Sequence, residues 1–437
     1  MSAQRGTHDG AWAVFLIFLR LGLTSFGGPV AHLGYFHTEF VQRRAWLSEA
    51  AYAELVALCQ FLPGPASSQV GMALGLSRAR YLGALAAWAG FTLPSALLLS
   101  ALGLGIASGG WGLPNGLIHG LKIVAVAVVA QALWGMARTL CRGLVRIGIA
   151  LTATLGVLWW SGIFSQLAVM AGAAVIGWVL LKPTVEPKGD GLSIAVSRPV
   201  AWLSLGIFFA LLAGLPLIAQ RWPDSLAALM DGFYRCGALV FGGGHVVLPL
   251  LQNAVVDSGW VSSDTFVAGY AAAQAVPGPL FTFAAFLGAS MGGWSGALVA
   301  LLAIFLPSLL LVIGVLPFWQ SLRRNGGVQA ALAGVNAAVV GLLLAALYEP
   351  LWTHTIVKPL DLALAILALL ALTVGKWPAL ASGAGGGRRR GVCVGLDLLF
   401  VGARLAGDSV LKNVIADKSQ APPVPATPMV TAAPRPV

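Results

Sequence analysis

Long apolar runs, separated by polar or glycine-rich segments, dominate the chain. About 20 such residues form a helix that crosses a hydrocarbon layer of roughly 30 Å. The pattern predicts spanning helices in the segments 11–30, 81–107, 116–137, 161–181, 199–219, 226–245, 296–318, 328–348 and 359–375. One further apolar stretch, 147–160, is short for a complete crossing.

Two more segments are weakly apolar, and Pro-Gly-Pro divides each of them. The tripeptides are residues 63–65 within segment 48–77 and residues 277–279 within segment 262–290. Both prolines lack an amide hydrogen and clash with the preceding turn, so no helix continues through them. We expect each segment to form two short helices, and the chain to be an all-α polytopic membrane protein with about 10–13 spans.

Composition supports this reading and excludes a water-soluble enzyme or binding domain. Of the 437 residues, 58% are hydrophobic and only 9% are charged, whereas about a quarter are charged in a typical soluble domain. The formal net charge is +11. In a membrane protein such an excess usually lies in cytoplasmic loops, so it does not imply a nucleic acid partner. We expect a multi-pass protein of the plasma (bacterial inner) membrane, in contact with the lipid bilayer.

The two halves of the chain repeat the same uncommon residues in the same order. Arg20 and Phe26-Gly27-Gly28 recur about 215 positions later as Arg235 and Phe241-Gly242-Gly243. Gln60 and the first Pro-Gly-Pro recur as Gln274 and the second one, and Leu93-Pro94-Ser95 recurs as Leu306-Pro307-Ser308. Transporters are often built from such homologous halves.

The repeat divides the chain into five parts. These are an N-terminal tail (1–10), a first repeat (11–181), a connecting loop and linker helix (182–225), a second repeat (226–380) and a Gly/Arg-rich, then Pro/Ala-rich tail (381–437). The composition of the last part predicts that it is largely disordered.

Charged residues around the Pro-Gly-Pro segments indicate how the repeats are oriented. Basic residues flank the first segment: Arg43, Arg44, Arg78 and Arg80. The corresponding part of the second half is acidic instead, with Asp257 and Asp264. Because basic loops face the cytoplasm, the halves are predicted to point in opposite directions. We therefore expect an inverted repeat.

Arg20 and Arg235 lie inside hydrophobic segments. A guanidinium there costs at least about 2.5–3.5 kcal/mol on insertion scales, so something must compensate. Arginine forms a planar, multidentate contact with oxyanions and stays charged. The alternative is a structural arginine that caps carbonyl groups or reaches the membrane surface.

Consecutive glycines and Pro-Gly-Pro breaks both expose backbone amides. Glycine pairs can unwind a helix and form a nest of donors for an anion. A helix that starts after a break directs its free amides and positive dipole end into the protein, which suits a tetrahedral dianion. The alternatives are close helix packing through small residues and glutamines that merely hold the broken backbone.

The candidate substrate site combines these features from both halves. The first half contributes Arg20, Phe26, Gly27, Gly28, Gln60, Pro63, Gly64, Pro65 and Ser67. The second half contributes Arg235, Phe241, Gly242, Gly243, Gln274, Pro277, Gly278 and Pro279. Three nearby ionisable residues could couple transport to protons: His32, Glu54 and His245. An imidazole or carboxylate in a dry cavity titrates near neutral pH. An interfacial or loop position would give them no such role.

The sequence lacks the common signatures of catalysis. It contains no Walker loop and no His-Glu-x-x-His, Gly-x-Ser-x-Gly or haem-attachment motif. The four cysteines, Cys59, Cys141, Cys236 and Cys393, are too far apart for a metal-site motif. We expect no cofactor, no metal site and no ATP hydrolysis by this chain.

Two Phe-Gly-Gly elements, each followed by a tryptophan (Trp46 or Trp260) and then by Gln-x-x-Pro-Gly-Pro, resemble the chromate ion transporter family in its long, two-domain form. The resemblance covers about residues 11–350. It implies a secondary carrier that exports chromate from the cytoplasm, gives chromate resistance and has halves of opposite orientation. The sequence departs from the doubled pattern in one motif, where Gly244 corresponds to Pro29.

Other functions remain compatible with the residues alone. Sulfate is also a tetrahedral dianion, so a carrier or channel for sulfate or another oxyanion is the first alternative. A membrane-embedded redox enzyme is the second, and it would need a flavin, haem or iron–sulfur site. Oligomers, including a homodimer, are compatible with the sequence.

Overall fold

The structure is a computed structural model, and it describes residues 10–374 except 27, 109–114, 161–162, 182–193, 195, 224 and 242–246. Every regular element in these residues is helical, which confirms the predicted all-α class. The first repeat contains α1 (Ala11–Thr24), α2 (Gly28–Phe36), the π-helical η1 (His37–Arg43), α3 (Glu49–Phe61), α4 (Ala66–Ala107), α5 (Asn115–Leu140), α6 (Leu144–Trp159) and α7 (Ile163–Leu180). The helix α8 (Arg198–Arg221) lies in the predicted linker.

The second repeat follows the same order. It contains α9 (Leu226–Leu239), α10 (Val247–Val255), α11 (Ser263–Ala275), the 3₁₀ turn η3 (Leu280–Thr282), α12 (Phe283–Val315), the 3₁₀ turn η4 (Leu316–Phe318), α13 (Trp319–Arg324), α14 (Gly326–Ala346), the π-helical η5 (Leu347–Trp352), α15 (Thr353–Thr355) and α16 (Pro359–Val374). Both Pro-Gly-Pro tripeptides separate two helices, as predicted: α3 from α4, and α11 from α12.

The long helices α4 and α12 are sharply kinked at equivalent positions. Ala79 and Arg80 have φ/ψ of −132°/30° and 53°/−146°, and Gly292 and Gly293 have nearly the same angles, −137°/23° and 65°/−151°. Glycines let the two arms of each helix pack closely: a Cβ atom on Gly75 would lie 2.1 Å from the carbonyl oxygen of Gly83. The internal repeat is thus a repeat of backbone conformation as well as of sequence.

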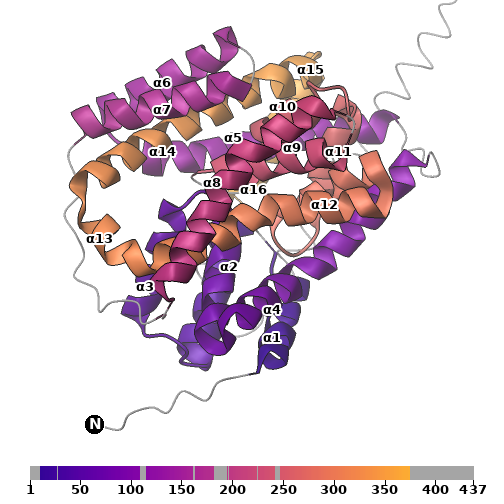
Figure 1. Cartoon of the computed structure of the whole chain (residues 1–437). Coiled ribbons are helices and arrows are strands. Elements are labelled where there is room, and N and C mark those ends of the chain that lie inside the picture. The colour runs from indigo at the N-terminus through magenta and orange to yellow at the C-terminus, as the bar shows by residue number, and fades with distance from the viewer. Residues whose placement is uncertain are drawn as a thin grey trace, which may run out of the picture.

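Each repeat packs its first helix on its long kinked helix, again through glycine. A Cβ atom on Gly22 of α1 would lie 2.7 Å from the carbonyl oxygen of Phe91, and one on Gly237 of α9 would lie 2.1 Å from that of Ile304. The kinked helices α4 and α12 also pack on each other, which joins the repeats. Figure 1 shows α1 and α4 on one side of α9 and α12, with α6, α7 and α14 on the other.

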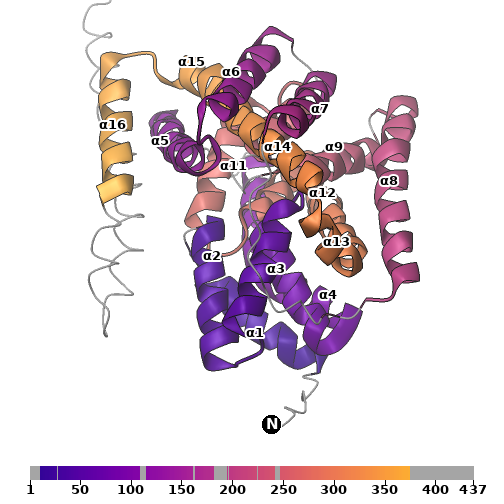
Figure 2. The ribbon, with the colours of Figure 1, turned by 90° about the vertical axis from the view of Figure 1, so that its left-hand side faces the viewer.

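The remaining helices pack around the outside of these four helices. The helix α14 packs against α6 and α7, and α8 packs against α9 and α12. Figure 2 shows α16 beside α5, at the opposite edge from α8. Two polar side-chain contacts hold α5 in place: Lys122 is paired with Asp264 of α11, and His119 Nε2 lies 2.9 Å from Asp361 Oδ1 of α16.

In the described residues, five helical stretches are long and apolar enough to cross a membrane. They are 66–107, 122–140, 198–221, 280–322 and 326–349, and four shorter apolar helices accompany them. Two predicted spans are too long at their C-terminal ends, because α1 ends at Thr24 and α9 ends at Leu239. In both cases the chain becomes extended at the next residue, Ser25 or Val240, just before Phe-Gly-Gly.

Candidate functional site

The Pro-Gly-Pro turn of each repeat meets the unwound segment of the other repeat. The amide of Gly64 donates a hydrogen bond to the carbonyl oxygen of Val240 (2.6 Å), and the amide of Gly278 donates one to that of Ser25 (3.0 Å). Val240 and Ser25 are the equivalent residues directly before Phe241 and Phe26. The two repeats therefore cross at two symmetry-related points. We call the Gly64–Val240 contact the first crossing and the Gly278–Ser25 contact the second crossing.

Glycine is required at both crossings for two reasons. Gly64 has φ +122° and Gly278 has φ +114°, a region that side-chain-bearing residues avoid. A Cβ atom on Gly64 would lie 2.3 Å from Ser308 Oγ, and one on Gly278 would lie 2.6 Å from Ser95 Oγ. These serines end the repeated Leu-Pro-Ser motifs, so each Pro-Gly-Pro packs against that motif of the other repeat.

Buried hydroxyl groups without hydrogen-bond partners gather around the crossings. The hydroxyls of Ser25, Ser68, Thr92 and Ser308 have no partner in the described part of the chain, and these residues are at most 3% exposed. An unsatisfied buried polar group costs about 1–3 kcal/mol, so each one in a native interior calls for a partner. This pattern is typical of a place where a polar ligand or water binds.

Contacts place two of these residues, Ser308 and Ser25, directly at the crossings, and Ser68 precedes Gln69 in the first turn of α4. Ser308 lies against Gly64 at the first crossing, and Gln69 beside it donates from Nε2 to the carbonyl oxygen of Pro63 (2.7 Å). At the second crossing, Ser25 accepts the bond from Gly278, whose Cα also faces Ser95. Thr92 lies one turn before Ser95 on α4, and its carbonyl oxygen accepts a hydrogen bond from Ser95 Oγ.

The first repeat supplies most of the polar lining. Ser25, Gln69 and Thr92 correspond by the repeat to Val240, Phe283 and Phe305. Ser68 corresponds to Thr282, whose hydroxyl is already bonded to the carbonyl oxygen of Pro279 (2.7 Å). The site is therefore symmetric in its backbone and asymmetric in its side chains.

The N-terminus of α4 faces the same region. The helix begins at Ala66, directly after Pro65, and no side chain caps it. Ser67 and Ser68 form its first turn and are buried. Free amides at a helix start carry partial positive charge and attract anions. Together with the adjacent hydroxyls, they offer neutral hydrogen-bond donors to an oxyanion.

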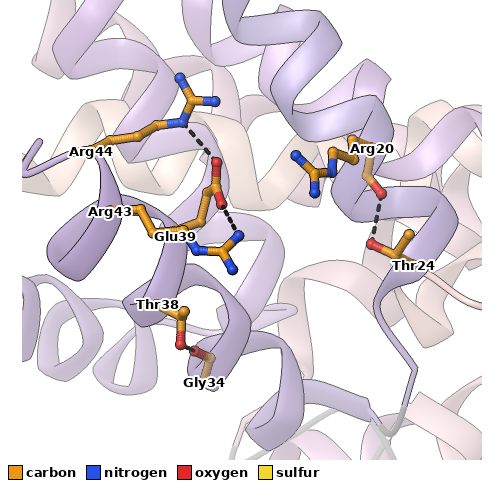
Figure 3. A network of polar contacts seen from close by, with 7 residues as sticks. All are labelled: Arg20, Thr24, Gly34, Thr38, Glu39, Arg43 and Arg44. Atoms are coloured by element: carbon orange, nitrogen blue, oxygen red, sulfur yellow. Dashed lines mark hydrogen bonds and ion pairs between the residues drawn. The ribbon is translucent and has the colours of Figure 1, made fainter. Parts of the chain in front are cut away.

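Arg20 lies one turn before the C-terminal end of α1 and has an exposed side chain, whereas the opposite face of α1 packs on α4. Its carbonyl oxygen accepts a bond from Thr24 Oγ1 (2.8 Å). Figure 3 shows its side chain extending toward the side on which Glu39 binds Arg43 and Arg44, at 3.3 and 2.8 Å. No acidic partner of Arg20 is found among the described residues.

Arg235 has a different environment, because it is paired with Asp231 one turn earlier on α9. The side chain of Asp231 is 4% exposed and that of Arg235 is 21% exposed. Asp231 is not among the predicted site residues, although an acid four positions before an arginine on one helix is a recognisable pair in sequence. At the equivalent position before Arg20 the first repeat has Leu16. That both arginines hold one dianion together stays a prediction.

The other predicted site residues have varied positions. Phe26 and Phe241 are half-buried, Gln60 is exposed on α3, and Gln274 donates to the hydroxyl of Tyr270 (2.8 Å). Two candidate coupling residues are buried: Glu54, and His32, whose ring meets that of Phe91 edge-on at 5.2 Å. Four predicted residues lie outside the described part of the chain: Gly27, Gly242, Gly243 and His245.

A family model built from known protein sequences matches each of the two repeats separately. The sequence model described as "Chromate transporter" covers residues 12–178 and 227–387. The chain belongs to the chromate transporter family. As a member of this family it is a multi-pass membrane transporter and not an enzyme, and the two matched regions agree with the two repeats of the fold.

Several curated relatives align with most of this chromate transporter family member. A "Chromate transport protein" of Cupriavidus metallidurans is 30% identical over 372 residues, which is 82% of this chain and 86% of the relative. A "Probable chromate transport protein" of Synechococcus elongatus is 29% identical, covering 75% and 81%, and a "Chromate transport protein" of Pseudomonas aeruginosa is 28% identical, covering 76% and 78%. No solved structure matches the chain.

Proposed function

We propose that this transporter exports chromate from the cytoplasm across the plasma membrane and thereby gives resistance to it. The names of the three relatives support chromate as the substrate. Outward movement of a dianion is favourable when the inside is negative, by about 4.6 kcal/mol at 100 mV for two charges at roughly 2.3 kcal/mol each. Export therefore needs no energy source in the chain itself.

The observation that carries this proposal is the unpartnered buried hydroxyls of Ser25 and Ser308 at the crossings and of Ser68 at the uncapped start of α4. Hydroxyl and amide donors match the oxygen atoms of a tetrahedral anion, and they can release it because they carry no full charge. Arg20 and Arg235, each one turn before the end of its helix, supply the positive charge in this proposal. The Phe-Gly-Gly segments and Gln60 and Gln274 complete the predicted set.

The crossings also suggest how access alternates between the two sides. Each repeat is bonded to the other at the place where its own helix is broken. In the proposed inverted arrangement, one repeat rocks against the other about these two contacts, and the site opens to one side of the membrane at a time. Because the two arms of α4, and of α12, pack closely at their kinks, each helix would transmit this motion along its length.

The experiment is chromate uptake into everted membrane vesicles, in which export appears as accumulation. We expect Ser68→Ala and Ser308→Ala each to weaken apparent chromate affinity about tenfold, because a hydrogen bond to a charged group contributes about 1.5–3 kcal/mol. Ser100→Ala is the matched control, since its hydroxyl is equally buried in α4 but bonds to the carbonyl oxygen of Ala96 (2.7 Å).

Three outcomes would count against parts of this proposal. Wild-type vesicles that accumulate no chromate would refute the function. Wild-type affinity in both serine variants would refute the location of the site. Strong inhibition by equimolar sulfate would favour the broader oxyanion carrier, because the hydroxyl donors do not distinguish the two tetrahedral dianions.

A further inference from the structure

The ion pair of Asp231 and Arg235 is incomplete on both sides. Only one terminal nitrogen of the guanidinium bonds the carboxylate, and it bonds only Oδ2. Asp231 Oδ1 and Arg235 Nε are buried and have no hydrogen-bond partner among the residues that the structure describes. A buried pair usually needs further hydrogen bonds to offset the loss of hydration. Arg235 therefore keeps donors for another anion while its charge is neutralised by Asp231.

The surroundings offer no other compensating charge in the described residues. The helices packed against α9 are α8, α10 and α12. The helices α10 and α12 contain no titratable residue, and α8 contains only Arg198 and Arg221, at its two ends. On α9 itself, the remaining titratable groups are Cys236, which is buried, and Tyr234, whose hydroxyl donates to the carbonyl oxygen of Phe208 (3.0 Å). Asp231 and Arg235 thus depend on each other.

We propose that Asp231 is the built-in counter-ion of Arg235, that chromate displaces it, and that the displaced carboxylate takes up a proton. The inference rests on the proposed function. In the empty site the charges of Asp231 and Arg235 cancel. A dianion bound to Arg235 would leave Asp231 as a second, uncompensated negative charge in an apolar interior, which strongly favours its protonated form. One proton then enters the site with each dianion and leaves when the dianion leaves, so one net negative charge crosses and the membrane potential supplies half the driving force that it would give a bare dianion.

The i, i+4 spacing suits this exchange, because Asp231 can leave Arg235 by a change of rotamer without moving α9. The first repeat has Leu16 at the equivalent position. Proton uptake by this counter-ion exchange is thus confined to the second repeat, while Arg20 presents a permanently available charge.

The test measures proton uptake with purified transporter, using chromate titrations in two buffers of different ionisation enthalpy at pH 7.5. The difference in heat gives the number of protons taken up per chromate. We expect wild type to take up about one proton more than Asp231→Asn, in which the side chain keeps its shape but cannot titrate. Protonation of chromate itself contributes equally to both proteins and cancels. Asp264→Asn removes the carboxylate of a different ion pair, with Lys122, and should behave as wild type.

The double variant Asp231→Asn/Arg235→Gln separates this role from a purely structural one. It restores a neutral pair of similar shape, so we expect a monodisperse protein with near wild-type thermal stability but at least tenfold weaker chromate binding and no extra proton. If Asp231→Asn alone does not fold, the double variant carries the comparison. Equal proton uptake in wild type and either variant would overturn the inference, as would wild-type chromate affinity in the double variant. A wild-type protein that neither binds nor transports chromate would instead refute the proposed function.

Discussion

Gly64→Ala and Gly278→Ala test the crossings most directly. Each substitution places a methyl group on a residue with φ above +110°, where strain costs about 1–3 kcal/mol. The methyl group also meets a serine hydroxyl of the other repeat, at 2.3 Å for Gly64 and 2.6 Å for Gly278. Overpacking of this kind typically costs another 1–3 kcal/mol or so. The total of about 2–6 kcal/mol is a large part of the 5–15 kcal/mol by which proteins are usually stable.

The chain offers a control that separates strain from collision. Gly259 also has a positive φ, +78°, but nothing lies within 4 Å of an added Cβ atom. We therefore expect Gly259→Ala to cost only about 1–2 kcal/mol. A second variant, Gly278→Ala/Ser95→Ala, removes the colliding hydroxyl and leaves a Cβ contact at 3.2 Å. It should recover part of the loss.

The assay is thermal unfolding of purified protein in detergent, combined with chromate uptake by vesicles at matched protein content. We expect Gly64→Ala and Gly278→Ala to unfold at clearly lower temperatures than Gly259→Ala and to transport poorly even when folded. If either crossing variant is as stable and active as the Gly259 variant, the close contact between Pro-Gly-Pro and the Leu-Pro-Ser motif of the other repeat is wrong.

Two further predictions concern charged residues of the first repeat. Arg20→Gln should weaken apparent chromate affinity tenfold or more in vesicle uptake. The control Arg221→Gln, at the exposed end of α8, should have no effect. Equal chromate affinity in the two variants would remove Arg20 from the site. Burial raises the pKa of Glu39, but the bonds and charges of Arg44 and Arg43 outweigh burial and hold the pKa below its usual 4.5. Its contribution to stability should therefore be present above that value and be lost as the pH falls through the lowered pKa. Thermal unfolding from pH 7 to pH 3 should show a steeper loss in wild type than in Glu39→Gln, and parallel curves would contradict the pairing.

Much of the fold could be predicted because its signals are local. Proline and glycine determine where helices break, and both Pro-Gly-Pro breaks occur where expected. Boundaries beside Phe-Gly-Gly were less predictable. The apolar run continues through Ser25, but α1 ends just before this residue. The carbonyl oxygen of Ser25 accepts a hydrogen bond from the amide of Gly278, about 250 positions away. Hydropathy carries no information about such a distant partner.

The candidate site could be predicted only in part. The repeat identified Pro-Gly-Pro, Phe-Gly-Gly, the two arginines and the Leu-Pro-Ser motif that ends in Ser308, but it gave no reason to select Ser25 or Thr92, since single hydroxyls are common in apolar helices. Repetition also gave the two arginines the same weight. The structure separates them, because Asp231 is present in one repeat and Leu16 stands in its place in the other. Departures from a repeat were therefore as informative as its matches.

The reciprocal bonding of Gly64 with Val240, and of Gly278 with Ser25, has a consequence for how such a transporter can be built. A polypeptide with one repeat alone would leave a glycine amide and an extended carbonyl group bare inside the bilayer, where water cannot satisfy them. Two such polypeptides could satisfy each other by exchanging these groups. Half-length versions of this architecture are therefore expected to work only as pairs, and fusion of the halves into one chain fixes their ratio at one to one.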